Sequence, residues 1–132
     1  MILVDTSVWI DYFNGLVNTQ TDRLDDALTA GDVLMGDLIL LEILQGIRND
    51  RDYTKTRQSL AVLEMVELFG ERMAMRCADN YRALRSKGIT IRKTADMIIA
   101  SYCIAHDLPL LFLDRDFRPF ADHLGLQPVI NT

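Results

Sequence analysis

Cysteine, proline and tryptophan are scarce in this chain, and no long hydrophobic run is present. Among its 132 residues the cysteines are Cys77 and Cys103, and neither their number nor their spacing matches a disulfide framework. Both fall within helical patterns, so we expect buried free thiols in a reducing compartment. No apolar stretch approaches the ~18 residues of a membrane span, and the N-terminus lacks the basic region and cleavage site of a signal peptide. We therefore expect a cytoplasmic protein that makes no use of the membrane.

The signatures of three common kinds of catalytic site are also missing. The chain has no G-x-x-x-x-G-K phosphate loop and no Gly-x-Ser-x-Gly motif around a nucleophilic serine. Its 2 histidines, His106 and His123, have no cysteine or histidine neighbours at the spacing of zinc ligands. A phosphate-loop enzyme, a serine hydrolase and a zinc centre are therefore poor explanations of this sequence.

The remaining composition is that of one globular domain spanning residues 1–132. Apolar residues make up 49% and charged residues 25%, and a chain of this length buries roughly two thirds of its unfolded surface. The net charge is −5, but residues 48–93 hold eleven bases against six acids, while the segments on either side are acidic. This basic stretch is either a solvated helical face or a surface for an acidic partner.

Apolar runs alternate with helical patterns along the whole chain. The runs predict strands at residues 1–4, 33–35, 65–68, 108–113 and 126–130. The patterns between them predict helices at residues 6–14, 22–30, 38–47, 53–63, 71–86, 95–106 and 117–123. Thr6 or Ser7 is expected to cap the first helix, and the apolar helix 38–47 is expected to be buried. The alternation predicts a three-layer α/β/α sandwich around a central parallel sheet.

Four acidic residues stand inside or directly after apolar runs, where a charge is costly. They are Asp5, Glu42, Asp96 and Asp114. Local roles are open to each of them: a helix cap at Asp5, a first-turn acid behind a Thr94 cap at Asp96, and a turn at Asp114. Glu42 is the hardest to explain in this way, because only a solvent-facing position would make it ordinary. Asp5 and Asp114 both follow predicted strands, which places them at the rim where parallel sheets bind ligands.

A shared site for these carboxylates would require a cation. Two carboxylates ~5 Å apart repel by about 3 kcal/mol at an effective dielectric constant of ~20. Three or four of them would cost much of a typical ~5–15 kcal/mol stability unless they shared protons or bound a divalent ion. All-oxygen ligation suits Mg²⁺, with Mn²⁺ as a possible substitute, and such sites are typical of phosphoryl chemistry.

The four acids stand in four segments that resemble the motifs of a known family. In chain order these segments are MILVDTSVWI at 1–10, LLEILQG at 40–46, the stretch 81–101 with ADMIIA at 95–100, and FLDRDF at 112–117. Together they resemble the motifs of a PIN domain, in particular the VapC toxins of bacterial toxin–antitoxin pairs, and the match extends over essentially the whole chain. Any one motif is weak, but four in this order at this length are a specific signal.

The resemblance implies a role for each acidic residue. It implies that four carboxylates surround Mg²⁺, those of Asp5, Glu42, Asp96 and Asp114. Asp5 and Asp96 would be the principal metal ligands, and the Thr6 hydroxyl would support the site. The fourth motif departs from the usual pattern, because Phe112 stands where the family often has Thr or Ser. Asp116 is therefore either a further member or a substitute for Asp114.

The resemblance also implies an activity and partners. VapC toxins are metal-dependent endoribonucleases, commonly homodimers, each inhibited by a VapB-type antitoxin. Cleavage of RNA by a metal-activated water is thus the first hypothesis, and the basic residues expected to hold RNA phosphates are Arg85, Lys87, Arg92 and Lys93. Residues 37–63 are expected to form a two-helix projection that serves as a dimer or antitoxin surface. The alternatives are a Mg²⁺-binding signalling module and a PIN-like scaffold without catalysis.

Overall fold

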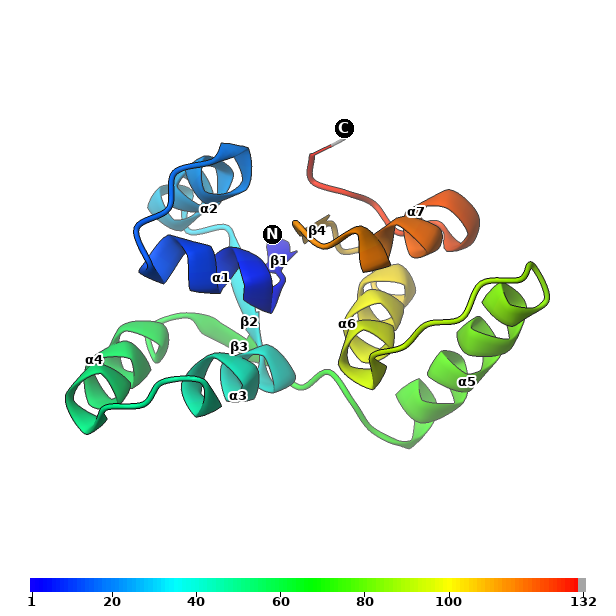
Figure 1. Ribbon diagram of the computed structural model, residues 1–132, viewed down its shortest axis with the longest axis horizontal. Helices are drawn as coiled ribbons and strands as arrows, with labels where there is room; N and C mark the ends of the chain where they lie inside the picture. The colour runs from blue at the N-terminus through cyan, green and yellow to red at the C-terminus, as the bar shows by residue number, and fades with distance from the viewer. Residues whose placement is uncertain (131–132) are drawn as a thin grey trace.

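A four-stranded parallel sheet forms the centre of the protein in the computed structural model, which describes residues 1–130 (Figure 1). Its strands are β1 (Ile2–Val4), β2 (Val33–Gly36), β3 (Glu64–Val66) and β4 (Leu110–Leu111). They lie in the order β3-β2-β1-β4, and each neighbouring pair is parallel. The parallel sheet predicted from the alternation of strands and helices is therefore confirmed.

Helices cover both sides of this sheet (Figure 1). One side carries α1 (Thr6–Phe13), α2 (Thr19–Ala30), α3 (Asp37–Gln45) and α4 (Asp50–Leu60). The other side carries α5 (Glu71–Arg85), α6 (Thr94–Ala105), the 3₁₀ turn η1 (Arg115–Phe117) and α7 (Arg118–Leu124). The three-layer α/β/α architecture is confirmed. Among the described residues, no helix has the length and apolar character needed to span a bilayer.

Side chains that precede the first two helices satisfy their free backbone N–H groups. Asp5 caps α1, which is the local role left open to it above, and its carboxylate accepts from the backbone N–H of Ser7; Thr6 and Ser7, the other expected caps, are the first residues of the helix. Asn18 forms a capping box with Thr21, so α2 begins at residue 19 rather than 22. The cap fixes the orientation of the Asp5 carboxylate, because one of its oxygens points towards the start of α1.

The predicted strand at residues 126–130 was wrong. Within the described part of the chain this segment makes one parallel bridge, between Leu110 and Pro128, and hydrogen bonds from the Leu110 N–H to Gln127 and from the Val129 N–H to Leu110. Pro128 has no N–H to extend the ladder. β4 is correspondingly short, at 2 residues rather than the six predicted.

Helix α3 is less buried than its apolar sequence predicts. Only Ile39 and Ile43 are fully buried, while the Leu41 side chain is 55% exposed and Glu42 is half-buried. The helix packs on α1 and α4 along one face, and its other face is open. The expectation of burial all round was therefore wrong, although the predicted pair of helices between residues 37 and 63 is confirmed as α3 and α4.

Strands β1 and β4 are paired side by side in the buried core. Leu3, Val4, Leu110 and Leu111 are completely buried. Directly after β1, the backbone N–H of Asp5 donates a 2.9 Å hydrogen bond to the Leu111 carbonyl. The carboxyl ends of β1 and of its neighbour β4, at the edge of the four-stranded sheet, therefore lie side by side, which places the chain after each strand at one rim.

Candidate metal centre

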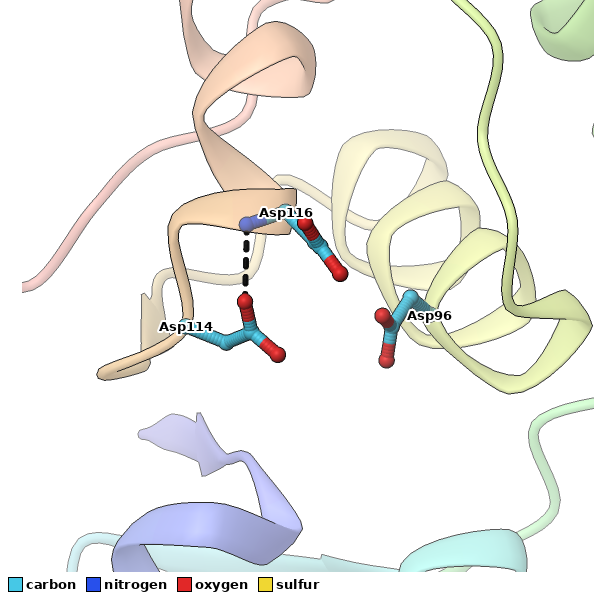
Figure 2. Close-up of side chains that lie close together, drawn as sticks. All are labelled: Asp96, Asp114 and Asp116. Atoms are coloured by element: carbon cyan, nitrogen blue, oxygen red, sulfur yellow. Dashed lines mark hydrogen bonds between the residues drawn. The ribbon is translucent and has the colours of Figure 1, made fainter.

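Three carboxylates meet at this rim. Asp96 in the first turn of α6 and the pair Asp114 and Asp116, around the start of η1, each offer an oxygen within 4.8 Å of the others. Figure 2 shows the three side chains turned towards a common point between α6 and the turn after β4. Seventeen residues lie between Asp96 and Asp114 in the sequence, and the turn of the chain from α6 into β4 brings the two side chains together.

Asp96 is the most unusual member of this cluster. The residue is 8% exposed, and its buried Oδ2 has no hydrogen-bond partner among residues 1–130. Burial and then the charge of Asp5 raise the pKa of Asp96 from its ordinary value to about 7, with Lys93 opposing the shift. A buried acceptor with no donor is rarely tolerated without a ligand, because leaving it unpaired costs about 1–3 kcal/mol.

Asp5 lies outside this group of three but close enough for its charge to act on Asp96, and it is more completely buried, at 5% exposure. The Ser7 hydroxyl donates a 2.8 Å hydrogen bond to its Oδ2. Burial raises the pKa of Asp5, the hydrogen bonds from Ser7 and Thr6 oppose the rise, and the charge of Glu42 adds to it. Asp5 therefore couples electrostatically to Asp96 on one side and to Glu42 on the other. The hydrogen bond from Ser7 could not be predicted from the sequence, which shows only that Ser7 follows Asp5 and Thr6.

Glu42 reaches the site through Thr6. The Thr6 hydroxyl donates a 2.7 Å hydrogen bond to Oε1 of Glu42, which joins α1 to α3. Glu42 lies outside the group of carboxylates within 4.8 Å of one another. The structure thus orders the acids as an inner group of Asp96, Asp114 and Asp116, with Asp5 beside it and Glu42 held at the edge by Thr6.

Asp114 and Asp116 both enter the inner group, so the structure does not make one a substitute for the other. Asp114 uses Oδ1 to accept a 2.9 Å hydrogen bond from the Asp116 backbone N–H, which forms the cap of η1. Its other oxygen, Oδ2, lies 3.6 Å from the ammonium nitrogen of Lys93. The turn that the Asp-Arg-Asp string predicts is therefore present, and it points both carboxylates towards Asp96 (Figure 2).

The donor set fits a hard divalent cation. The three groups that meet here, among the described residues, all offer carboxylate oxygens, and Asp96 also carries the buried, unpartnered Oδ2. Mg²⁺ and Mn²⁺ prefer such oxygens, and zinc prefers nitrogen and sulfur. Cys77 and Cys103 are buried free thiols, as predicted from the sequence. Asp96, Asp114 and Asp116, with Asp5 beside them, are the residues that could hold the ion.

The basic residues predicted to bind RNA lie at the last residue of α5 and on the connection from α5 to α6. Arg85, Lys87, Arg92 and Lys93 are all exposed. Lys93 is the member of this set for which an ion pair with the acids is seen. The sequence placed Lys93 near Asp96 along the chain, but it carried no signal for the contact with Asp114, which depends on the fold.

Comparison with known proteins now adds to this geometry. Residues 2–122 match the family described as PIN domain. The chain is 30% identical over 129 residues to "Ribonuclease VapC11" of Mycobacterium tuberculosis, and the match covers 96% of each chain. The chain belongs to the PIN-domain family, among the VapC ribonucleases. The same degree of identity and coverage relates this PIN domain to "VapC ribonuclease Mb1587" of Mycobacterium bovis.

Solved structures share the fold of this PIN domain. The crystal structure of VapBC2 from Rickettsia felis bound to a promoter DNA fragment matches with a TM-score of 0.73, at 18% identity, covering 97% of both chains. FitAcB from Neisseria gonorrhoeae matches with the same TM-score of 0.73 at 22% identity, covering 99% of this chain and 97% of the other. Membership of the PIN family favours a nuclease over the signalling module considered from the sequence.

Proposed function

We propose that this PIN domain is the toxin of a type II toxin–antitoxin pair and acts as a Mg²⁺-dependent endoribonuclease. The observation that carries the proposal is the buried Asp96 carboxylate, whose Oδ2 has no hydrogen-bond partner within residues 1–130 and which meets Asp114 and Asp116 at the rim of the sheet. Its relatives at 30% identity are named ribonucleases. A cation at these oxygens would polarise a substrate phosphate and lower the pKa of a water molecule.

Each acidic residue has a distinct part in this proposal. Asp96 and Asp5 provide the buried charge, and Asp114 and Asp116 close the site from the opposite side. Thr6 holds Glu42 through the 2.7 Å hydrogen bond, so that its second oxygen, Oε2, is available to orient a water or accept a proton. Asp5, Glu42, Asp96 and Asp114 are the proposed catalytic residues, with Thr6 and Asp116 supporting them.

The proposed reaction is hydrolysis of an RNA phosphodiester. Attack by water on phosphorus breaks the bond to the 3′-oxygen, so the products carry a 5′-phosphate and a 3′-hydroxyl. The acidic centre repels phosphates, and exposed Arg92 and Lys93, with Arg85 and Lys87 farther along the connection, would offset that repulsion. Arg92 and Lys93 directly precede the first turn of α6, where Asp96 lies.

A cleavage assay on total RNA tests this function. We expect cleavage that needs Mg²⁺ or Mn²⁺, stops with EDTA and is lost in Asp96→Asn, with 5′-phosphate ends on the products. End analysis by ligation distinguishes these ends from others. Cyclic 2′,3′-phosphate ends, or cleavage that survives EDTA, would contradict the mechanism. Cleavage that is unchanged in Asp96→Asn would contradict the site.

An antitoxin is the proposed protein partner, of the VapB type. Solved neighbours at 16–22% identity include "Toxin-antitoxin complex from Klebsiella pneumoniae" and "VapBC-1 from nontypeable Haemophilus influenzae". A groove of about 570 Å³ runs between α1, α3 and α4, with apolar Ile10, Phe13, Ile43 and Ile47 on its walls. Ile10 and Phe13 are 44% and 43% exposed, which is unusual for large apolar side chains. We propose this groove as the antitoxin surface.

A homodimer in the cytoplasm completes the proposed picture. The exposed face of α3 with Leu41 is available for self-association, as are the exposed side chains of Phe69 and Met75 near the start of α5. Sedimentation velocity at micromolar concentration tests the dimer directly. A monomer at ~50 µM, in the absence of antitoxin, would exclude a homodimer of the affinity common in stable oligomers.

A further inference from the structure

Lys93 occupies a position where helix stability does not favour lysine. It is the N-cap residue of α6, and its side chain makes no capping hydrogen bond. Ser, Thr, Asp and Asn are preferred at this position, because their oxygens accept from free N–H groups. A cation there also opposes the helix dipole, whose positive end lies at the N-terminus. A reason for this lysine must therefore come from outside the helix.

The acidic cluster supplies that reason. The Lys93 ammonium lies 3.6 Å from Oδ2 of Asp114, and Asp96 is three residues farther along the same chain. The charges of Asp114 and then Asp96 raise the pKa of Lys93, so the ammonium stays charged. Its side chain is 62% exposed and that of Asp114 is 32% exposed. The contact is thus an ion pair at the mouth of the cluster, held by charge rather than by packing, and it is free to open.

Both oxygens of Asp114 already have a partner while this pair persists, so a second cation would have to share one of them. Oδ1 caps η1 through the Asp116 N–H, and Oδ2 faces Lys93. A divalent ion bound between Asp96, Asp114 and Asp116 would need an Asp114 oxygen and would repel the ammonium beside it. The two cations are therefore coupled, and each lowers the affinity of the cluster for the other.

We propose that Lys93 is a built-in counter-ion of the acidic cluster, which stabilises the metal-free protein and competes with the divalent cation for Asp114. Binding of the metal breaks the Lys93–Asp114 pair and moves the ammonium towards solvent. This inference rests on the proposed metal site but not on the proposed RNA cleavage. Its consequence is a lower resting affinity for metal than the carboxylates alone would have.

Metal titration of charge variants tests the competition. The variants are Lys93→Gln, Lys93→Arg, and Lys87→Gln as a matched control on the same connection. Lys87 is exposed and forms no ion pair within residues 1–130.

Mn²⁺ dissociation constants come from calorimetry or from the EPR signal of free Mn²⁺. We expect roughly three- to tenfold tighter binding in Lys93→Gln, about twofold or less in Lys87→Gln, and a value near wild type in Lys93→Arg. The Lys93→Gln gain should shrink in 0.5 M salt.

Thermal unfolding gives a second readout that does not depend on activity. In EDTA, Lys93→Gln should melt below Lys87→Gln, because the acids lose a counter-charge. With saturating Mn²⁺ the order should reverse or the gap should close, so the melting temperature of Lys93→Gln rises most on metal addition.

The outcomes separate this inference from the function on which it rests. If Mn²⁺ binds equally to wild type and Asp96→Asn, the proposed metal site is wrong. If Asp96→Asn abolishes binding while Lys93→Gln and Lys87→Gln have the same affinity, the competition by Lys93 alone is wrong. Tighter binding in both Lys93→Gln and Lys93→Arg would also overturn it, since arginine keeps the charge.

Discussion

The Thr6 hydroxyl donates a 2.7 Å hydrogen bond to Oε1 of Glu42 across 36 residues of sequence. Thr6 follows the end of β1, and Glu42 lies in α3, which begins directly after β2. The pair therefore ties together the chain segments that leave two neighbouring parallel strands. It also fixes one oxygen of Glu42 and leaves Oε2 free, which makes the position of a half-buried glutamate well defined.

Removing the Thr6 hydroxyl should release Glu42. Thr6→Val keeps the shape of the side chain but cannot donate, so we expect kcat of RNA cleavage to fall roughly tenfold and stability to fall by about 1 kcal/mol. Thr6→Ser should retain most of both. A double-mutant cycle with Glu42→Ala checks the pairing. If Thr6→Val and Glu42→Ala have independent, additive effects on kcat, the hydrogen bond does not position Glu42.

Neutralising Asp96 should stabilise the metal-free protein. Asp96→Asn removes a buried charge that is repelled by Asp5, so the melting temperature in EDTA at pH 8 should rise by roughly 3–8 °C. The same change should abolish the rise that Mg²⁺ produces in wild type. Asp79→Asn, at an exposed position on α5, serves as the control and should leave both values unchanged. A lower melting temperature for Asp96→Asn than for wild type in EDTA would argue against electrostatic strain at this carboxylate.

The stability of the metal-free protein should fall as pH rises from about 4 to about 7. The pKa of Asp96 is raised from 3.8 to about 7, so within this window the folded protein holds a proton that the unfolded chain has released. Above about pH 7 this contribution should level off. Urea denaturation in EDTA at several pH values, with Asp96→Asn subtracted, isolates the effect. Metal affinity should weaken below pH 7, where protons compete for the carboxylate. A pH-independent difference between the two proteins would refute the raised pKa.

A side chain at Gly36 should disturb the junction that positions α3. A Cβ built at Gly36 would lie 2.6 Å from Cδ1 of Leu68, and Leu68 is almost fully buried and hydrogen-bonded through its N–H to Asp37. We expect Gly36→Ala to cost about 1–3 kcal/mol in chemical denaturation. Adding Leu68→Val should recover part of that loss. Gly46→Ala is the comparison, because its Cβ would meet no atom closer than 3.5 Å.

Charge in the groove should block the antitoxin without harming the nuclease. Ile10→Asp on α1 places a carboxylate on the apolar wall formed with Phe13 and Ile43. Antitoxin binding should weaken at least a hundredfold, while metal affinity and RNA cleavage stay within about threefold of wild type. Trp9 stacks on Phe13 with ring centroids 5.8 Å apart, so its fluorescence reports occupation of the groove. Unaltered antitoxin affinity in Ile10→Asp would place the interface elsewhere.

Much of this protein follows from local patterns in its sequence. Strand and helix periods predict the alternating elements, and alternation predicts a parallel sheet, because parallel strands need a crossover between them. The burial of Asp96 was also predictable, since it shares a helix face with Ile99, Ala100 and Cys103, all of which are buried. A charged residue among the apolar residues of one helix face can be recognised from the sequence alone. Here it identified the buried Asp96 carboxylate on which the proposed function rests.

Other features depended on distances that no local pattern encodes. The sequence made Glu42 the acid hardest to explain by a local role, but α3 packs along one face only, and Glu42 is half-buried. Asp116 was either a further member of the site or a substitute for Asp114, and the η1 cap places both carboxylates near Asp96. The Lys93–Asp114 pair links residues on opposite sides of a crossover. Composition and periodicity determined which elements form and which acids are costly. Tertiary packing decided which charges meet, because electrostatic energy depends on distances across the fold and not on separation along the chain.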